Sequence, residues 1–214
     1  MLKYIEFITE SKKAIDHPFI LAAKRGSATK VKEFIKSGVD INMQDSDKRT
    51  ALMYAALDGF LIIVNILIEA GADVNITDYQ HRTALMMSKT NSVINKILTV
   101  QDIDVNIQDD KGNTIMLEQL VYTYNVLNII GLLKKFITKG LNLDIKNNYD
   151  RNFYEELEYK KINTIESDKV KLNEIIKYMD EHFPKYKEEW DKNKWDTEWY
   201  WKYHLNQNID KFNI

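Results

Sequence analysis

A short motif recurs along this chain at a fixed interval, and the interval constrains the fold more than any other feature. Gly38 and Gly71 are 33 residues apart, and so are Thr50 and Thr83. A unit of this length cannot bury its apolar face alone, so the period predicts a solenoid of stacked helical units. Four units align. The third is two residues shorter and the fourth five residues longer than the period, and a surface loop can absorb both differences.

The motif carries residues that begin and end helices. Each unit after the first opens with a threonine whose hydroxyl can accept the free amide hydrogens of a helix N-terminus. These residues are Thr50, Thr83 and Thr114. In the first unit Asp16 can play this part, and Pro18 suits the first helical turn. Gly26 and Gly59 then stand where the first helix ends, since glycine tolerates positive φ.

Apolar spacing predicts two helices in each unit. Paired alanines keep the first helix thin, so that neighbouring units can approach closely; they are Ala22, Ala23, Ala55 and Ala56. The second helix carries apolar pairs spaced i, i+4 on one face, as at Ile63, Val64, Leu67 and Ile68. A glycine ends this helix, and the chain then turns outward into an extended finger. The residues Gly71-Ala72-Asp73-Val74-Asn75 form this junction in the second unit.

The second unit, from Thr50 to Asn75, resembles the ankyrin repeat almost position by position. The first unit matches nearly as well and the third and fourth loosely, so the resemblance covers roughly residues 16–148. It implies an all-α ankyrin-type solenoid of helix-turn-helix repeats. The histidine usual in the family is replaced by an apolar residue in every unit. These residues are Ile20, Met53, Met86 and Leu117, and we expect apolar contacts to replace the histidine's hydrogen bond.

Four segments follow from this reading. Residues 1–15 are predicted to form an N-terminal capping helix, and residues 16–148 the four repeats. Residues 149–183 are interpreted as a degenerate fifth repeat, in which Asn152 caps a helix through Leu157 and a second helix runs from about Lys169 to His182. Residues 184–214 contain all four tryptophans and are interpreted as an aromatic-rich helical C-terminal cap. The alternative is an aromatic surface that docks a partner.

Composition excludes several other functions. The net charge is −2, which gives no reason to expect binding to nucleic acid or to an anionic membrane. No cysteine is present, so disulfides and thiolate chemistry are excluded. No apolar run approaches the roughly 20 residues that span a bilayer, and the N-terminus lacks a signal-peptide pattern. We expect a cytoplasmic protein, or one delivered into a host cell as an effector.

The motifs of catalysis and metal binding are missing. The four histidines are scattered and none has metal-ligand spacing; they are His17, His81, His182 and His204. No glycine-rich phosphate loop or nucleophile elbow occurs. We expect a protein that is not an enzyme and uses no cofactor or metal. Two alternatives stay open: an enzyme whose site lies between Trp190 and His204, and a purely structural spacer.

The ankyrin resemblance places a concave binding face on the finger tips and the first helices. The chain is therefore interpreted as a protein–protein interaction module that is monomeric when free. Within this class, the two roles considered are an inhibitor and an effector-type adaptor. The residues carried over to that face are Lys24, Arg25, Asp47, Arg49, Tyr54, Leu57, Asp58, Tyr79, Gln80, Arg82, Lys111 and Asn113. Arginine and tyrosine are enriched in interface cores, so Arg49→Ala combined with Arg82→Ala is predicted to weaken binding without loss of thermal stability.

Overall fold

The computed structural model describes residues 17–117, 126–163 and 166–193. Every regular element in these ranges is a helix, as the repeat pattern predicts. The chain divides into two compact units. Unit 1 comprises residues 1–118 and 135–142, and unit 2 comprises residues 119–134 and 143–214. The predicted N-terminal cap, residues 1–15, lies outside the described residues.

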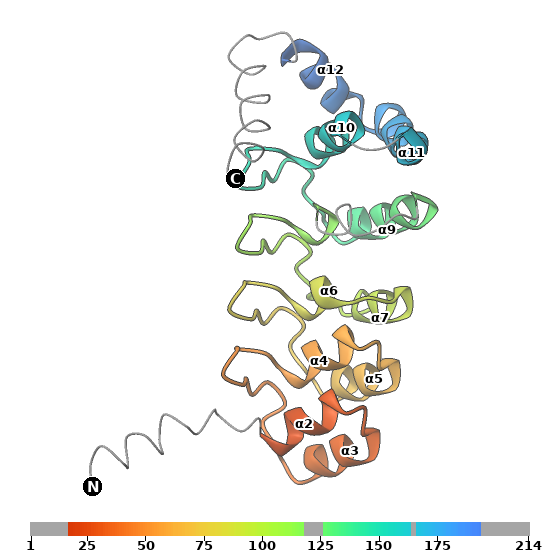
Figure 1. The fold of residues 1–214 in the computed structure, drawn as a ribbon. Helices are drawn as coiled ribbons and strands as arrows, with labels where there is room; N and C mark the ends of the chain where they lie inside the picture. Colours follow the sequence, from red (N-terminus) through yellow and green to blue (C-terminus); the bar gives the residue numbers. More distant parts are fainter. Residues whose placement is uncertain (1–16, 118–125, 164–165, 194–214) are drawn as a thin grey trace, which may run out of the picture. The chain divides into compact units, whose positions relative to one another are not determined.

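The described part of unit 1 contains three complete helix pairs. They are α2 (Pro18–Lys24) with α3 (Ala28–Lys36), α4 (Ala51–Leu57) with α5 (Leu61–Glu69), and α6 (Ala84–Met87) with α7 (Asn91–Ile97). The first helices pack in one row, α2 on α4 and α4 on α6, and the second helices pack in another, α3 on α5 and α5 on α7. Figure 1 shows these two rows, with an extended finger projecting from the helices before each new pair. The arrangement confirms an all-α solenoid.

Threonine caps open the first helices where the sequence predicts them. The hydroxyl of Thr50 accepts a hydrogen bond from the N–H of Met53, and that of Thr83 accepts one from Met86, both at 3.3 Å. In the first repeat His17 is the cap, because its Nδ1 accepts the N–H of Phe19 at 3.2 Å. The prediction of Asp16 as cap is therefore replaced by His17. Thr114 directly precedes the helical residues 115–117.

Gly26 ends α2 at a φ of +73°, a conformation that strains any residue with a side chain. A Cβ atom placed there would lie 3.0 Å from the ring of Phe60, which is the N-cap residue of α5 in the next repeat. Both the backbone angle and the ring of the neighbouring repeat therefore favour glycine at this position.

The core of unit 1 lies between the two helix rows and is made of aliphatic side chains and small residues. Ala23, Ala55 and Ala56 are fully buried, so the first helices stack closely. The apolar residues that replace the family's histidine are buried too; they are Ile20, Met53, Met86 and Leu117. Apolar packing has taken the place of a polar contact there, as predicted.

A ladder of asparagines joins successive repeats. The side-chain oxygen of Asn42 accepts the N–H of Asp73 at 2.9 Å, and Asn75 does the same for Asp104 at 2.9 Å. The Nδ2 of Asn75 also donates to the carbonyl of Asp102 at 2.8 Å. Asn106 repeats this pattern toward Asn142 and Gly140. Each amide thus satisfies backbone groups of the next repeat, and the boundary is held by hydrogen bonds as well as by apolar burial.

Unit 2 contains α9 (Val126–Thr138, whose last four residues belong to unit 1), α10 (Phe153–Asn163), α11 (Glu166–His182) and α12 (Pro184–Asn193). Asn152 and Glu155 form a capping box at the start of α10: each side chain accepts the other residue's backbone N–H, at 3.0 and 2.8 Å. The hydroxyl of Tyr154 on α10 donates to Asp180 on α11 at 2.7 Å. Lys187 on α12 pairs with the same carboxylate at 3.1 Å. These contacts fasten the three helices together.

Candidate protein-interaction surface

Each finger of unit 1 is built around one aspartate. Oδ1 of Asp45 accepts the backbone N–H groups of Asp47 and Arg49, both at 2.8 Å. Asp78 and Asp109 hold the second and third fingers by the same two bonds, to the second and fourth residues that follow them. In unit 2 Asn147 does this with its amide oxygen. One carboxylate or amide therefore fixes the tight turn that presents the tip residues.

The third residue after each anchor has positive φ. Gly112 occupies this position in the third finger, at +74°, where glycine is unstrained. The other fingers hold side chains there, with φ of +57° at Lys48, +56° at His81 and +60° at Asp150. Asp and His are enriched at such angles, but Lys is not. A side chain is therefore unfavourable at all three of these positions, and Lys48 is the least suited of the three to its angle.

Neighbouring fingers of unit 1 are tied by main-chain hydrogen bonds. The N–H of Tyr79 donates to the carbonyl of Asp47 at 3.2 Å, and the N–H of Asp110 donates to that of Gln80 at 3.0 Å. The amide of Gln44 adds a bond to the carbonyl of Thr77 at 3.1 Å. The three tips thus form a pre-organised row, which lowers the entropy lost when a partner binds.

Asp78 also pairs with two of the arginines that are predicted to lie on the binding face. Its Oδ2 accepts hydrogen bonds from Nε and Nη2 of Arg82, at 3.2 and 2.8 Å. Nε of Arg49, on the preceding finger, lies 3.6 Å from the same oxygen, an ion pair too long for a hydrogen bond. Burial opposes ionisation of Asp78, but the bonds from the Arg82 side chain and from backbone N–H groups outweigh it and lower its pKa. Both arginines are half-buried and support the fingers.

Tyr54 lies at the centre of the next layer, on α4. Its side chain is only 4% exposed, and its hydroxyl donates to Oδ2 of Asp45 at 2.8 Å. Burial, together with this bond, raises the pKa of Tyr54. The ammonium group of Lys24 lies 4.6 Å from the ring centroid, and the guanidinium carbon of Arg49 lies 5.8 Å from it. Tyr54 therefore joins α2, α4 and the first finger and offers little surface to a partner.

The remaining predicted residues lie nearer to solvent. Tyr79 is 62% exposed, and the ammonium group of Lys48 lies 5.0 Å from its ring centroid. The other exposed positions are Lys24, Arg25, Asp47, Asp58, Gln80 and Lys111, while Leu57 and Asn113 are half-buried. The structure thus divides the predicted set into a supporting group (Arg49, Tyr54 and Arg82) and a group that faces solvent.

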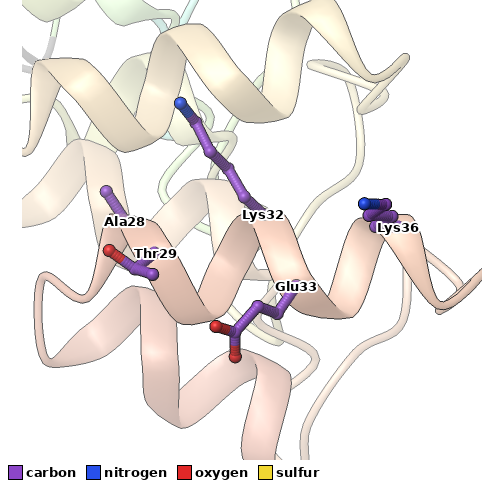
Figure 2. A pocket seen from close by; sticks show the side chains of 5 residues that line it. All are labelled: Ala28, Thr29, Lys32, Glu33 and Lys36. Carbon is purple, nitrogen blue, oxygen red and sulfur yellow. The ribbon is translucent and has the colours of Figure 1, made fainter.

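Two hollows in unit 1 differ in what lines them. The first, of about 260 Å³, runs along α3 and is lined by Ala28, Thr29, Lys32, Glu33 and Lys36. Figure 2 shows that Lys32 and Glu33 extend to opposite sides of this helix, so the charged groups of these two residues do not converge on one point of the hollow. The second, of about 430 Å³, lies between the first two fingers and is lined by Gln44, Lys48, Ile76, Thr77, Asp78, Tyr79 and His81. We call this second one the interfinger hollow.

The described part of the chain offers neither a cluster of metal ligands nor a membrane-spanning helix. Within it, no group of three or more His, Cys, Asp or Glu side chains could hold a metal ion. No helix in the same ranges combines the length and apolarity that crossing a membrane requires.

Stacked helix pairs, a repeated finger and a row of presented tips define a helical repeat protein. The repeats are ankyrin repeats: residues 19–109 match the family model for ankyrin repeats (3 copies). Ankyrin repeats are protein–protein interaction modules and are generally not enzymes. The comparison with curated proteins gave no match.

Sequence reasoning missed the residues that organise this surface. Asp45, Asp78 and Asp109 were visible as a repeated acid before each fingertip, but the residues they hold became clear only from the turn geometry. Lys48 and His81 occupy the turn position that is glycine in the third finger, and both line the interfinger hollow.

Proposed function

We propose that this chain binds a partner protein through the face formed by the finger tips and first helices of unit 1. The observation that carries the proposal is the row of three tips, each anchored by an aspartate and tied to its neighbour through the backbone. Such a row holds its exposed side chains in fixed positions before binding, which favours a specific protein interface. The ankyrin resemblance predicts that this face is concave.

Tyr79 is the residue best suited to anchor a partner on this face. Tyrosine is enriched in binding hot spots because it contributes a large rigid surface at little entropic cost. Its side chain is 62% exposed at the tip of the middle finger, between fingers that present Asp47 and Lys111. We propose contacts from Tyr79, Gln80, Asp47 and Lys111, with Lys24, Arg25 and Asp58 at the helix ends.

The supporting group has a different part in the proposal. Arg49, Tyr54 and Arg82 set the position of the tips, and Leu57 and Asn113 contribute only part of their surface. We therefore replace the expectation that the double substitution of Arg49 and Arg82 spares stability, because both side chains pair with the buried Asp78.

The finer role that we propose is that of a monomeric inhibitor or adaptor, acting in the cytoplasm or in a host cell after delivery. A rigid face on a small chain can cover the surface of another protein without chemistry of its own. For the rest of the chain we propose that α10 and α11 form a degenerate fifth repeat and that α12 begins a C-terminal cap.

Site-specific photo-crosslinking tests the proposed face. A photoreactive phenylalanine analogue replaces Tyr79 in the full chain, and a matched variant carries it at Ile62, which is 68% exposed on the second helix α5. Irradiation in the native cell is expected to give a discrete adduct from position 79, identified by mass spectrometry, and none from position 62. Equal labelling from both positions contradicts the proposed face, and absence of any adduct supports a structural spacer.

A further inference from the structure

We propose that the interfinger hollow is an acceptor for a carboxylate-bearing segment of the partner, so that the protein bound by this chain presents Asp or Glu side chains at the first two fingers. The inference rests on the proposed function and deepens it by naming the chemistry of the partner at one place.

The charge of the hollow favours an anion. Lys48 and His81 both line it and both are exposed. The one carboxylate among the lining residues, Asp78, is 3% exposed and is neutralised by Arg82 and Arg49. Asp47 is a neighbour in the turn but does not line the hollow. An incoming carboxylate therefore meets the positive charge of Lys48 without a competing free acid in the lining.

The backbone at this place is strained in a way that presents those groups. Lys48 and His81 occupy the turn position that Gly112 fills without strain in the third finger. A left-handed conformation is unfavourable for a residue with a side chain, and residues held in this way cluster at functional sites. Among the described residues of unit 1, the two strained positions are also the two that bring a basic side chain to the hollow.

Hydrogen bonds hold the walls of the hollow in place before a partner binds. The Gln44 amide donates to the carbonyls of Lys48 and Thr77, at 2.6 and 3.1 Å, so one side chain spans both fingers. Tyr79 contributes a ring at 5.0 Å from the Lys48 ammonium group, and this ring limits the directions in which that group can move. A volume of about 430 Å³ has room for one or two acidic side chains.

The test uses the full chain and two end-blocked peptides, tetraglutamate and tetraglutamine, followed by backbone ¹H–¹⁵N chemical shifts. Tetraglutamate is expected to give saturable shifts centred on Tyr79 and His81, and tetraglutamine is expected to give none. Lys48→Gln keeps the size and the backbone strain but removes the charge, so its Kd for tetraglutamate is expected to rise roughly 3- to 10-fold. Lys30→Gln, at an exposed lysine on α3 that neither lines the hollow nor belongs to the proposed face, is expected to change the Kd less than about twofold.

Lys48→Gly distinguishes a loss of charge from a loss of stability, because it removes the charge while relieving the strained angle. It is expected to lose affinity as Lys48→Gln does while unfolding at a higher temperature. Binding of both peptides alike, shifts centred away from the hollow, or unchanged affinity in both Lys48 variants would overturn the inference. These outcomes are separate from the crosslinking at Tyr79, which reports the proposed face whether or not an acidic peptide binds.

Discussion

Arg82 donates two hydrogen bonds to a single oxygen of Asp78 within one finger, since its Nε and Nη2 lie 3.2 and 2.8 Å from Oδ2 of the aspartate. The carboxylate is buried and its other oxygen holds the turn, so the pair connects the presentation of the tip to the stability of the stack. The residues that shape the binding face are therefore partly residues that hold the fold together.

The first prediction concerns removal of the two arginines. Arg82→Ala is expected to lower the free energy of unfolding by about 1–2 kcal/mol, because a buried carboxylate loses two charge-assisted hydrogen bonds while solvent partly compensates. Arg49→Ala is expected to cost less, since its Nε makes only a 3.6 Å ion pair. Urea unfolding of both variants checks the order, with the exposed Lys111→Ala as control. A cost for Arg49→Ala above that for Arg82→Ala contradicts this reading of the site.

The second prediction is that ionised Asp78 contributes to the free energy of unfolding and that this contribution is lost at acidic pH. Its pKa in the folded state is lowered, so its contribution is present above the ordinary value of about 3.9 and is lost as the pH falls through the lower folded value. Asp78→Asn keeps an oxygen that can hold the turn, as Asn147 does in unit 2, but cannot titrate. We expect the free energy of unfolding of this variant to fall less between pH 5 and pH 3. Parallel pH profiles for the variant and the parent would show that Asp78 titrates normally.

The strained turn gives a stabilising substitution. His81→Gly is expected to raise the free energy of unfolding by about 0.5–1 kcal/mol, since relief of the left-handed angle exceeds the entropy cost of glycine. The reverse change at the third finger, Gly112→Ala, is expected to destabilise by a comparable amount. Differential scanning calorimetry measures both. A lower melting temperature for His81→Gly would mean that the imidazole contributes more than its backbone costs.

The asparagine ladder predicts a large effect from a partly exposed residue. Asn75→Ala removes two hydrogen bonds to the next repeat and is expected to cost about 1–3 kcal/mol. Asn91→Ala, at an exposed position in the first turn of α7, serves as the matched control and is expected to change stability by less than about 0.5 kcal/mol. Guanidinium unfolding followed by circular dichroism compares them, and similar midpoints would exclude an energetic role for the ladder.

The burial of Tyr186 and its bond to Asp144 hold α12 in place within unit 2. Its ring is 4% exposed, and burial together with the hydrogen bond to Asp144 raises its pKa to about 12. Because the raised pKa favours the protonated phenol in the folded state, its contribution is present below pH 10 or so and is lost as the pH rises toward 12. Tyr186→Ala is expected to cost about 2–4 kcal/mol at neutral pH, measured by thermal unfolding. Unchanged stability would favour the alternative in which the C-terminal segment docks a partner.

The repeat positions made much of unit 1 predictable, because each has a local physical cause. Thr50 and Thr83 cap α4 and α6 through their own hydroxyl groups. Gly26 and Gly59 end α2 and α4 at a φ of +73°. The helix predicted from about Lys169 to His182 corresponds to α11, which begins slightly earlier, at Glu166. These features depend on residues a few positions apart, which a single sequence displays directly.

The candidate site was less predictable because its contacts join residues of different repeats. The ankyrin resemblance placed Tyr54 and Arg49 on the binding face, yet Tyr54 bonds to Asp45 and Arg49 turns toward Asp78 on the next finger. Which side of a finger a long side chain takes depends on the charge that the neighbouring repeat offers. A periodic pattern indicates that two repeats stack but does not show which of their side chains meet.

The asparagine ladder has a consequence for how such a chain can change its length. Asn42 meets Asp73 through the same bond by which Asn75 meets Asp104, so the junctions are interchangeable. Excision of residues 50–82 would bring Asn42 opposite Asp104 and leave Arg49 followed by the capping Thr83. Genetic loss or duplication of a whole repeat would therefore conserve the asparagine bond at each new junction, so this part of the scaffold accepts a change in the number of fingers.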